Sequence, residues 1–280
     1  LNPPIMRLLL FLFTLSLSSL TFGQARFAVT LPKSMAEKPL DGRLFVLLST
    51  NADAEPRFQI SDGANTQIVI GADVENWQPG KKQFVGSADH DSYPISTPVE
   101  LPAGTYYAQV LLHKYETFNR ADGHVVKLPM DRGEGQQWNR APGNLISTPT
   151  QITVSGKPGE MIDLAFDKAI TTIEPAKDTE WIKHIKIRSK MLSEFWGRDM
   201  YLGAHVLLPK DWDKHPDVKY PVAVNHGHSP ADFGGLRTTH PDQSTPSASS
   251  ARFAMDSYTR SVQQDASHLH KAWPRPDFPP

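Results

Sequence analysis

The residues best suited to chemistry lie in the last third of the sequence, where residues 226–230 read His-Gly-His-Ser-Pro. They follow the apolar run at residues 220–225, which predicts a strand that ends in this loop. Histidine is a common metal ligand, and a serine hydroxyl is a common nucleophile. Glycine can adopt backbone angles closed to other residues and can so turn a backbone N–H toward a substrate. The loop therefore allows nucleophilic catalysis, metal binding or the stabilisation of a developing charge.

Ser229 is the candidate nucleophile of this loop. Residues 227–231 nearly match the Gly-x-Ser-x-Gly motif, in which a sharp turn after a strand exposes the serine. That motif uses the backbone N–H of the residue after the serine, and here that residue is Pro230, which has no N–H. An aspartate and a histidine must also follow at the ends of later strands, whereas the remaining sequence predicts one helix and loops. Ser229 is therefore not expected to act as the nucleophile.

His226 and His228 offer the alternative of a metal site. They are similar to the paired histidine ligands that open metal-dependent amidohydrolase barrels, with Asp232 or His240 as possible further ligands. A zinc site needs three or four ligands and outer-shell partners that orient them. A barrel of that kind would also need about 200 further residues. A metal-dependent hydrolase that uses these two histidines is thus an alternative interpretation of the loop.

Acidic groups also occur earlier in the chain. None has the ordered spacing of a calcium loop with its central glycine. Aspartate is common in turns, so these groups are expected to be solvated turns. They are Asp89-His90-Asp91, Asp73 with Glu75, and Asp131 with Glu134.

Two strands and one helix are expected to position the loop. Residues 181–188 alternate between apolar and polar types, and residues 200–208 form a second strand, with a turn predicted at residues 191–198 that carries Phe195 and Trp196. Beyond the loop, apolar residues recur at steps of three and four, which predicts one stripe on a helix of about five turns. The stripe consists of Ala254, Tyr258, Val262, Ala266, Leu269 and Trp273.

Two antiparallel strands followed by a Pro-Val-Ala-Val strand that leads into His226-Gly227 resemble the beginning of an α/β-hydrolase of the esterase type. The resemblance covers about residues 178–230 and implies that His228 or Ser229 supplies a backbone N–H to the oxyanion hole. It implies serine acyl transfer on a small-molecule ester without a cofactor. No Gly-x-Ser-x-Gly occurs in the sequence, so we expect a C-terminally truncated fragment, residues 176–280, that is inactive alone.

The preceding region, residues 26–175, is predicted to be a β-sandwich, and its Leu-Pro-Ala-Gly-Thr-Tyr stretch at residues 101–106 resembles the approach to a strand in Ig-like accessory domains. Short strands are predicted at residues 44–48, 67–70, 105–112, 151–154 and 161–166, separated by clusters of Gly and Pro. The continuous apolar run at residues 44–48 predicts a strand covered on both faces. A sandwich before a hydrolase domain is similar to the architecture of the siderophore-esterase group. The competing class is a non-catalytic exported sandwich protein that binds glycan or a partner.

The first 25 residues predict export. Arg7 precedes an apolar run at residues 8–13, and small residues follow near Ala25, as in a signal peptide. The run is too short to cross a bilayer, so no membrane span is expected after its removal. The chain has no cysteine, which excludes disulfides and thiolate metal sites. Its formal net charge of −1 gives no basis for nucleic-acid binding. We expect a secreted or periplasmic protein.

Overall fold

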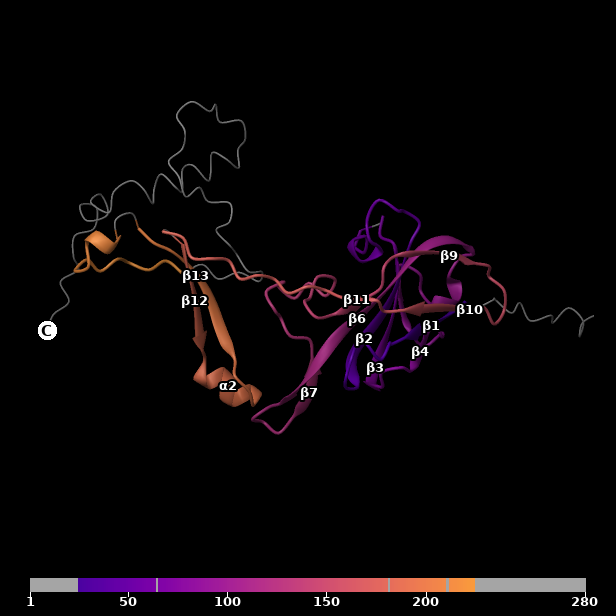
Figure 1. Cartoon of the computed structure of the whole chain (residues 1–280), viewed down its shortest axis with the longest axis horizontal. Helices are drawn as coiled ribbons and strands as arrows, with labels where there is room; N and C mark the ends of the chain where they lie inside the picture. The colour runs from indigo at the N-terminus through magenta and orange to yellow at the C-terminus, as the bar shows by residue number, and fades with distance from the viewer. Residues whose placement is uncertain (1–24, 64, 181, 210–211, 225–280) are drawn as a thin grey trace, which may run out of the picture. The chain divides into compact units, whose positions relative to one another are not determined.

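The computed structural model describes residues 25–224 except residues 64, 181 and 210–211, and its chain falls into two units. Unit 1 comprises residues 25–116, 127–130 and 137–172 of the described chain. Unit 2 comprises residues 117–126, 131–136 and 173–224. Figure 1 labels the elements of both. The expected signal peptide, the loop at residues 226–230 and the helix at residues 254–273 lie outside the described residues.

Unit 1 is built from strands. They are β1 (Arg26–Thr30), β2 (Leu40–Ser49), β3 (Ile68–Trp77), β4 (Lys82–Val85), β5 (Asp91–Tyr93), β6 (Gly104–Asn119), β7 (Val125–Leu128), β8 (Leu145–Ile146), β9 (Thr150–Val154), β10 (Met161–Ala165) and β11 (Lys168–Ala169), with the 3-10 turns η1 (Pro56–Phe58) and η2 (Pro98–Glu100). The last residues of β6, 117–119, and the first residues of β7, 125–126, belong to unit 2. Every strand predicted in this region is present, which confirms those predictions.

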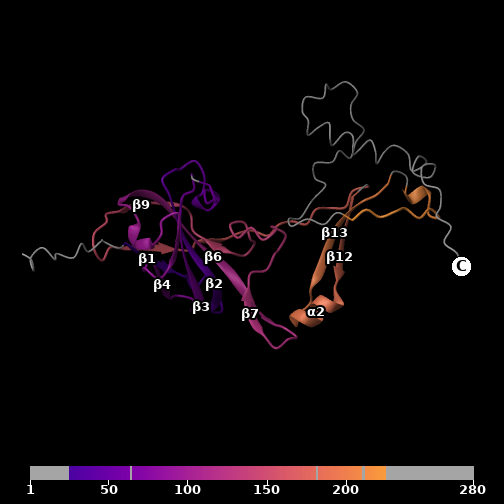
Figure 2. The ribbon, with the colours of Figure 1, turned by 180° about the vertical axis from the view of Figure 1, so that it is seen from behind.

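The strands form two sheets. The smaller has the order β10-β1-β4, in which β1 and β10 are parallel and β1 and β4 antiparallel. The larger has the order β11-β8-β6-β2-β3-β5, and β7 and β9 also pair with the long strand β6. In Figures 1 and 2, β2 lies between β6 and β3 and pairs with both.

Both sheets contribute to one hydrophobic core. Phe27 and Val29 of β1 are buried in the same cluster as Leu44, Val46 and Leu48 of β2. Successive side chains of a strand point to opposite faces, so the intervening residues of β2 lie on the other face of the larger sheet. There Phe45 and Leu47 join a second cluster around Leu111 and Ile146. The prediction that residues 44–48 are covered on both faces is confirmed.

Unit 2 contains β12 (Ile182–Arg188), α2 (Lys190–Trp196), β13 (Tyr201–Leu207) and the 3-10 turn η3 (Trp212–Lys214). All seven residues of β12 pair with β13 in antiparallel register, from Ile182 opposite Leu207 to Arg188 opposite Tyr201. Both views show the two strands side by side, with α2 between their ends (Figures 1 and 2). The two strands predicted before the loop are therefore confirmed.

The prediction of a turn at residues 191–198 was wrong, because residues 190–196 form a helix with a cap at each end. The Ser189 side chain accepts a hydrogen bond from the backbone N–H of Leu192 at 3.3 Å, which satisfies a donor of the first turn. Gly197 ends the helix with a φ of 65°, the left-handed conformation that glycine adopts without strain.

The end of β6 and the turn that follows it pack against α2 within unit 2. The Phe118 and Trp196 rings meet edge to face, 5.4 Å apart, and the Arg120 guanidinium lies 5.0 Å from the Phe195 ring centroid. The backbone N–H of Ala121 donates to the carbonyl of Phe195 at 2.7 Å. Helix α2 is thus held by aromatic, cationic and backbone contacts at once.

Taken as a whole, the described chain is mostly β-sheet, with several antiparallel pairings and one short α-helix, and no α/β-hydrolase domain is evident in it. The strand predicted at residues 220–225 is not formed over the described residues 220–224, where Val222 and Val224 are each 85% exposed. A strand is stable only when neighbours satisfy its backbone and cover its side chains, and no described strand pairs with this segment. No helix within the described residues is long and apolar enough to span a membrane.

Candidate functional site

The structure does not describe the loop that the sequence singles out. His226, Gly227, His228 and Ser229, together with the further ligand candidates Asp232 and His240, lie outside the described residues. Their geometry is therefore untested. The described chain reaches Val224.

The acidic groups do not form a metal site. The described residues contain no group of three or more Asp, Glu or His side chains that could hold a metal ion. Asp131 and Glu134 share one loop, in which the Asp131 carboxylate accepts the backbone N–H of Gly133 at 2.8 Å and the Glu134 carboxylate accepts that of Arg132 at 2.7 Å. Asp131 is exposed as predicted, but Glu134 is buried, so the prediction of a solvated group was wrong there. Asp89 also lies in a turn.

The remaining acidic residues were wrongly predicted to be in turns. Asp73 lies within β3 and Asp91 begins β5, and both carboxylates bind the guanidinium of Arg43, that of Asp73 at 2.9 Å. Burial opposes the charge of Arg43, but the hydrogen bonds to Asp91 and Asp73 outweigh it and raise the pKa of Arg43. Strand register brings both aspartates to Arg43. Asp73 of β3 lies opposite Arg43 of β2, and Asp91 of β5 pairs with Gly71, two residues before Asp73 on β3. The partner of these carboxylates is a guanidinium of the chain itself.

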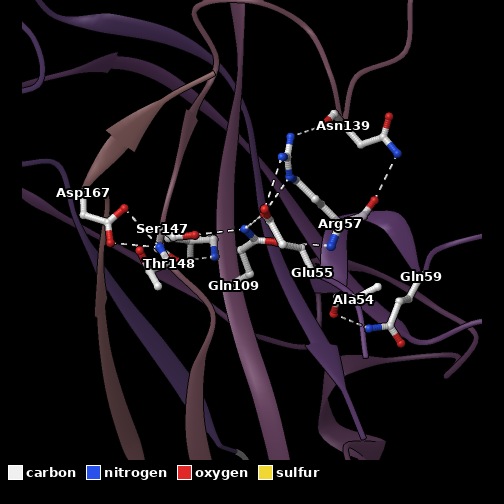
Figure 3. Close-up of polar contacts among 10 residues, drawn as sticks. Ala54, Glu55, Arg57, Gln59, Gln109, Asn139, Ser147, Thr148 and Asp167 are labelled. Atoms are coloured by element: carbon white, nitrogen blue, oxygen red, sulfur yellow. Dashed lines mark hydrogen bonds and ion pairs between the residues drawn. The ribbon is translucent and has the colours of Figure 1, made fainter. Parts of the chain in front are cut away.

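The principal buried polar group of unit 1 is Gln109, whose side chain is fully buried in β6 (Figure 3). Its amide nitrogen donates to the Glu55 carboxylate at 2.7 Å and to the carbonyl of Ser147 at 2.9 Å. Its amide oxygen accepts the backbone N–H of Arg57 at 3.2 Å. Gln109 thus joins the sheet to the loop before η1 and to the segment after β8.

Arg57 extends this network to a third segment. Its guanidinium pairs with Glu55 at 2.8 Å and donates to the carbonyl of Asn139 at 2.6 Å (Figure 3). The Asn139 amide donates back to the carbonyl of Arg57 at 3.0 Å. We call Glu55, Arg57, Gln109, Asn139 and Ser147 the Gln109 network.

The electrostatics of the Gln109 network suit a structural role. Burial alone would raise the pKa of Glu55, but its hydrogen bonds from Arg57 and Gln109 prevail and lower that pKa. Glu55 is therefore ionised at neutral pH and unable to act as a general acid there. Its oxygens are occupied by Arg57 and Gln109, so the network fixes loops on the sheet rather than presenting a reactive group.

Unit 2 contains an Asp–His pair that the sequence analysis missed. The Asp178 carboxylate contacts Nδ1 of His184 at 3.1 Å and accepts the His184 backbone N–H at 2.8 Å. These contacts lower the pKa of Asp178. His205 lies opposite on β13, with the two rings 4.6 Å apart. An aspartate can orient a histidine base in this way, and among the described residues no serine is hydrogen-bonded to either ring.

Comparison with protein-family models, with curated proteins and with solved structures finds no match to this chain. The function must therefore be argued from the residues themselves. A lone glutamine in the apolar run of residues 106–112 was the sequence feature that could have revealed the Gln109 network. Glu55 and Arg57 gave no such indication, because charged residues beside a proline are typical of exposed loops.

Proposed function

We propose that this chain is an exported protein of the esterase-like serine-hydrolase type, in which residues 176–280 form the front of the hydrolase domain and a preceding β-sandwich of the Ig-like type serves as an accessory domain. The observation that carries the proposal is the strand pair β12–β13. Its seven residue pairs come before the segment that leads to the His-Gly loop, in the order that the resemblance implies.

In this proposal the loop acts through its backbone. A backbone N–H of His228 or Ser229, turned by Gly227, would stabilise the negative charge that develops on the carbonyl oxygen of an ester substrate. One such donor contributes about 2.7–4 kcal/mol to the transition state. The resemblance also requires a serine in a Gly-x-Ser-x-Gly motif, which the sequence does not contain. The 280-residue chain is therefore expected to hydrolyse no ester by itself.

Hydrolysis of nitrophenyl acetate tests the role of the loop. The chain and its Ser229→Ala variant should release nitrophenol at the same rate as buffer containing an inert protein. Turnover that disappears in Ser229→Ala would make Ser229 the nucleophile and overturn this assignment. Turnover that requires added Zn²⁺ and disappears in His226→Ala would favour the metal-dependent alternative.

Export is tested by N-terminal sequencing of the mature protein. Cleavage near Ala25 is expected, since the residues before it have the pattern of a signal peptide. A mature protein that begins at Leu1 would refute export.

A non-catalytic binding protein is the second candidate, supported by one face of the larger sheet in unit 1. The Phe45 and Trp138 rings pack 4.8 Å apart there, and the Arg43 guanidinium lies 5.8 Å from the Phe45 ring centroid beside its two aspartates. Aromatic faces next to charged hydrogen-bonding groups suit a glycan. Calorimetry with oligosaccharides should then show binding that Trp138→Ala removes and that Trp212→Ala, in unit 2, leaves intact. Titrations that show no binding would exclude a glycan as the ligand of this face.

A further inference from the structure

The pair β12–β13 has two faces of different character. Alternation places Ile182, His184, Lys186 and Arg188 with Tyr201, Gly203, His205 and Leu207 on one face, which is polar except at its Ile182–Leu207 end. The other face, which we call the apolar hairpin face, consists of Ile185, Ile187, Leu202, Ala204 and Val206 with Lys183 at one end. Its three largest exposed side chains are Ile185, Ile187 and Leu202, which are 42%, 58% and 55% exposed.

An exposed face of this kind needs a cover. Contiguous apolar surface of this sort marks an interaction site on a soluble protein. A two-stranded hairpin is also only marginally stable unless further structure packs on its hydrophobic face. Within the described residues nothing buries Ile187 or Leu202, so the cover must come from another part of the chain or from another molecule.

The sequence beyond Val224 contains a segment of matching character and size. The apolar stripe at residues 254–273 would run about 30 Å along a helix, and the seven-residue strands of the hairpin extend about 23 Å. On the same helix Asp256, Arg260, Gln264, Ser267 and Lys271 would fall opposite the stripe, which gives one apolar and one polar side.

The connection is long enough for this segment to reach the hairpin. Residues 208–253 lie between β13 and the stripe, and as a flexible coil the 29 residues 225–253 alone reach about 30 Å, which exceeds the length of the hairpin strands. The stretch at residues 238–250 is rich in Ser, Thr and Pro, which is typical of a linker rather than of a packed element.

We propose that residues 254–273 of the same chain form a helix that covers the apolar hairpin face, with Val262 and Leu269 against Ile187 and Leu202. The helix then shields the hairpin, and its polar side faces solvent. This inference is independent of the hydrolase proposal, since it concerns only the hairpin and the stripe.

Thiol labelling tests the inference because the natural chain has no cysteine, so one introduced cysteine gives one signal. Leu202→Cys places a thiol on the apolar hairpin face, and Lys186→Cys places one on the opposite face of the same hairpin. In the full chain the cysteine at position 202 should react roughly tenfold more slowly than that at position 186, because labelling requires the helix to open.

Two further variants identify the cover. Val262→Glu, in the stripe, should bring the labelling rate at position 202 to that at position 186, whereas Gln264→Glu, on the polar side, should leave the protection unchanged. Protection from amide exchange in β12 and β13 should be present in every variant, as a check that the hairpin is folded. Equal labelling at positions 202 and 186, or protection that Val262→Glu does not remove, would overturn the inference. Protection that grows with protein concentration would overturn it too, in favour of a second copy of the chain.

Discussion

Replacement of Gln109 by leucine should destabilise unit 1 strongly, although leucine has a similar volume and leaves little cavity. Three hydrogen bonds are lost: those to the Ser147 carbonyl and the Arg57 N–H, and a third to the Glu55 carboxylate. A neutral hydrogen bond contributes about 1 kcal/mol, and one to a charged group about 1.5–3 kcal/mol. Because Glu55 can recover some hydration, we expect a loss of about 2–4 kcal/mol in the free energy of unfolding.

This loss can be measured on unit 1 alone. At each urea concentration, pulse-labelling hydrogen exchange of peptides from β2 and β6 reports the fraction of unit 1 that is unfolded. With a urea dependence of about 2 kcal/mol per M, the midpoint should fall by roughly 1–2 M. Gln151→Leu is the matched control, since Gln151 is an exposed glutamine of β9 and its replacement should change stability by less than about 0.5 kcal/mol. If Gln109→Leu is as stable as Gln151→Leu, the Gln109 network is not what holds the loops on the sheet.

Three further perturbations follow from the same contacts. The pKa of Glu55 is lowered in the folded state, so the stabilisation from its ionised form is present above the ordinary carboxyl pKa of about 4.3 and is lost as the pH falls through the lowered value. Glu55→Gln should therefore reduce the loss of unit 1 stability at acid pH. An unchanged loss of stability at acid pH would contradict the assignment. Gly197→Ala should accelerate amide exchange in α2, because a Cβ there would overlap the backbone oxygen of Asn119 and because the φ of 65° is strained for alanine. Gly203→Ala is the control and should not accelerate it, since a Cβ at Gly203 meets no described atom within 4 Å. Equal exchange in both variants would argue against the close approach of Gly197 to Asn119. Ser189→Ala should weaken α2 by about 0.5–2 kcal/mol, seen as faster exchange at Leu192, and unaltered exchange would exclude the cap.

The strands of unit 1 could be predicted from the sequence because their residues repeat with the period of a strand and end at Gly and Pro. Residues 44–48 even revealed burial on both faces, because a continuous apolar run has no side left for water. Helix α2 escaped prediction because its seven residues are too few to show a helical repeat. Its only local indications were Ser189 and Gly197 at its ends.

The polar groups were harder to predict, because their partners are distant in sequence. Gln109 and Glu55 are separated by 54 residues, and Arg57 and Asn139 by 82 residues. Asp73 and Asp91 were assigned to turns from their composition, and only the register of β2, β3 and β5 brings both to Arg43. The segment at residues 220–224 shows the opposite failure, since an apolar run predicts a strand whether or not a neighbour exists to pair with it.

The central proposal, that residues 176–280 are the front of an esterase-like hydrolase domain, is tested most directly by sequencing the coding region downstream of the Pro280 codon. The account predicts, in one of the three forward frames, a strand followed by Gly-x-Ser-x-Gly within about 100 codons, and then an aspartate and a histidine that each follow a further strand. Downstream sequence that lacks this motif in every frame would contradict the hydrolase assignment and leave the binding protein as the better account.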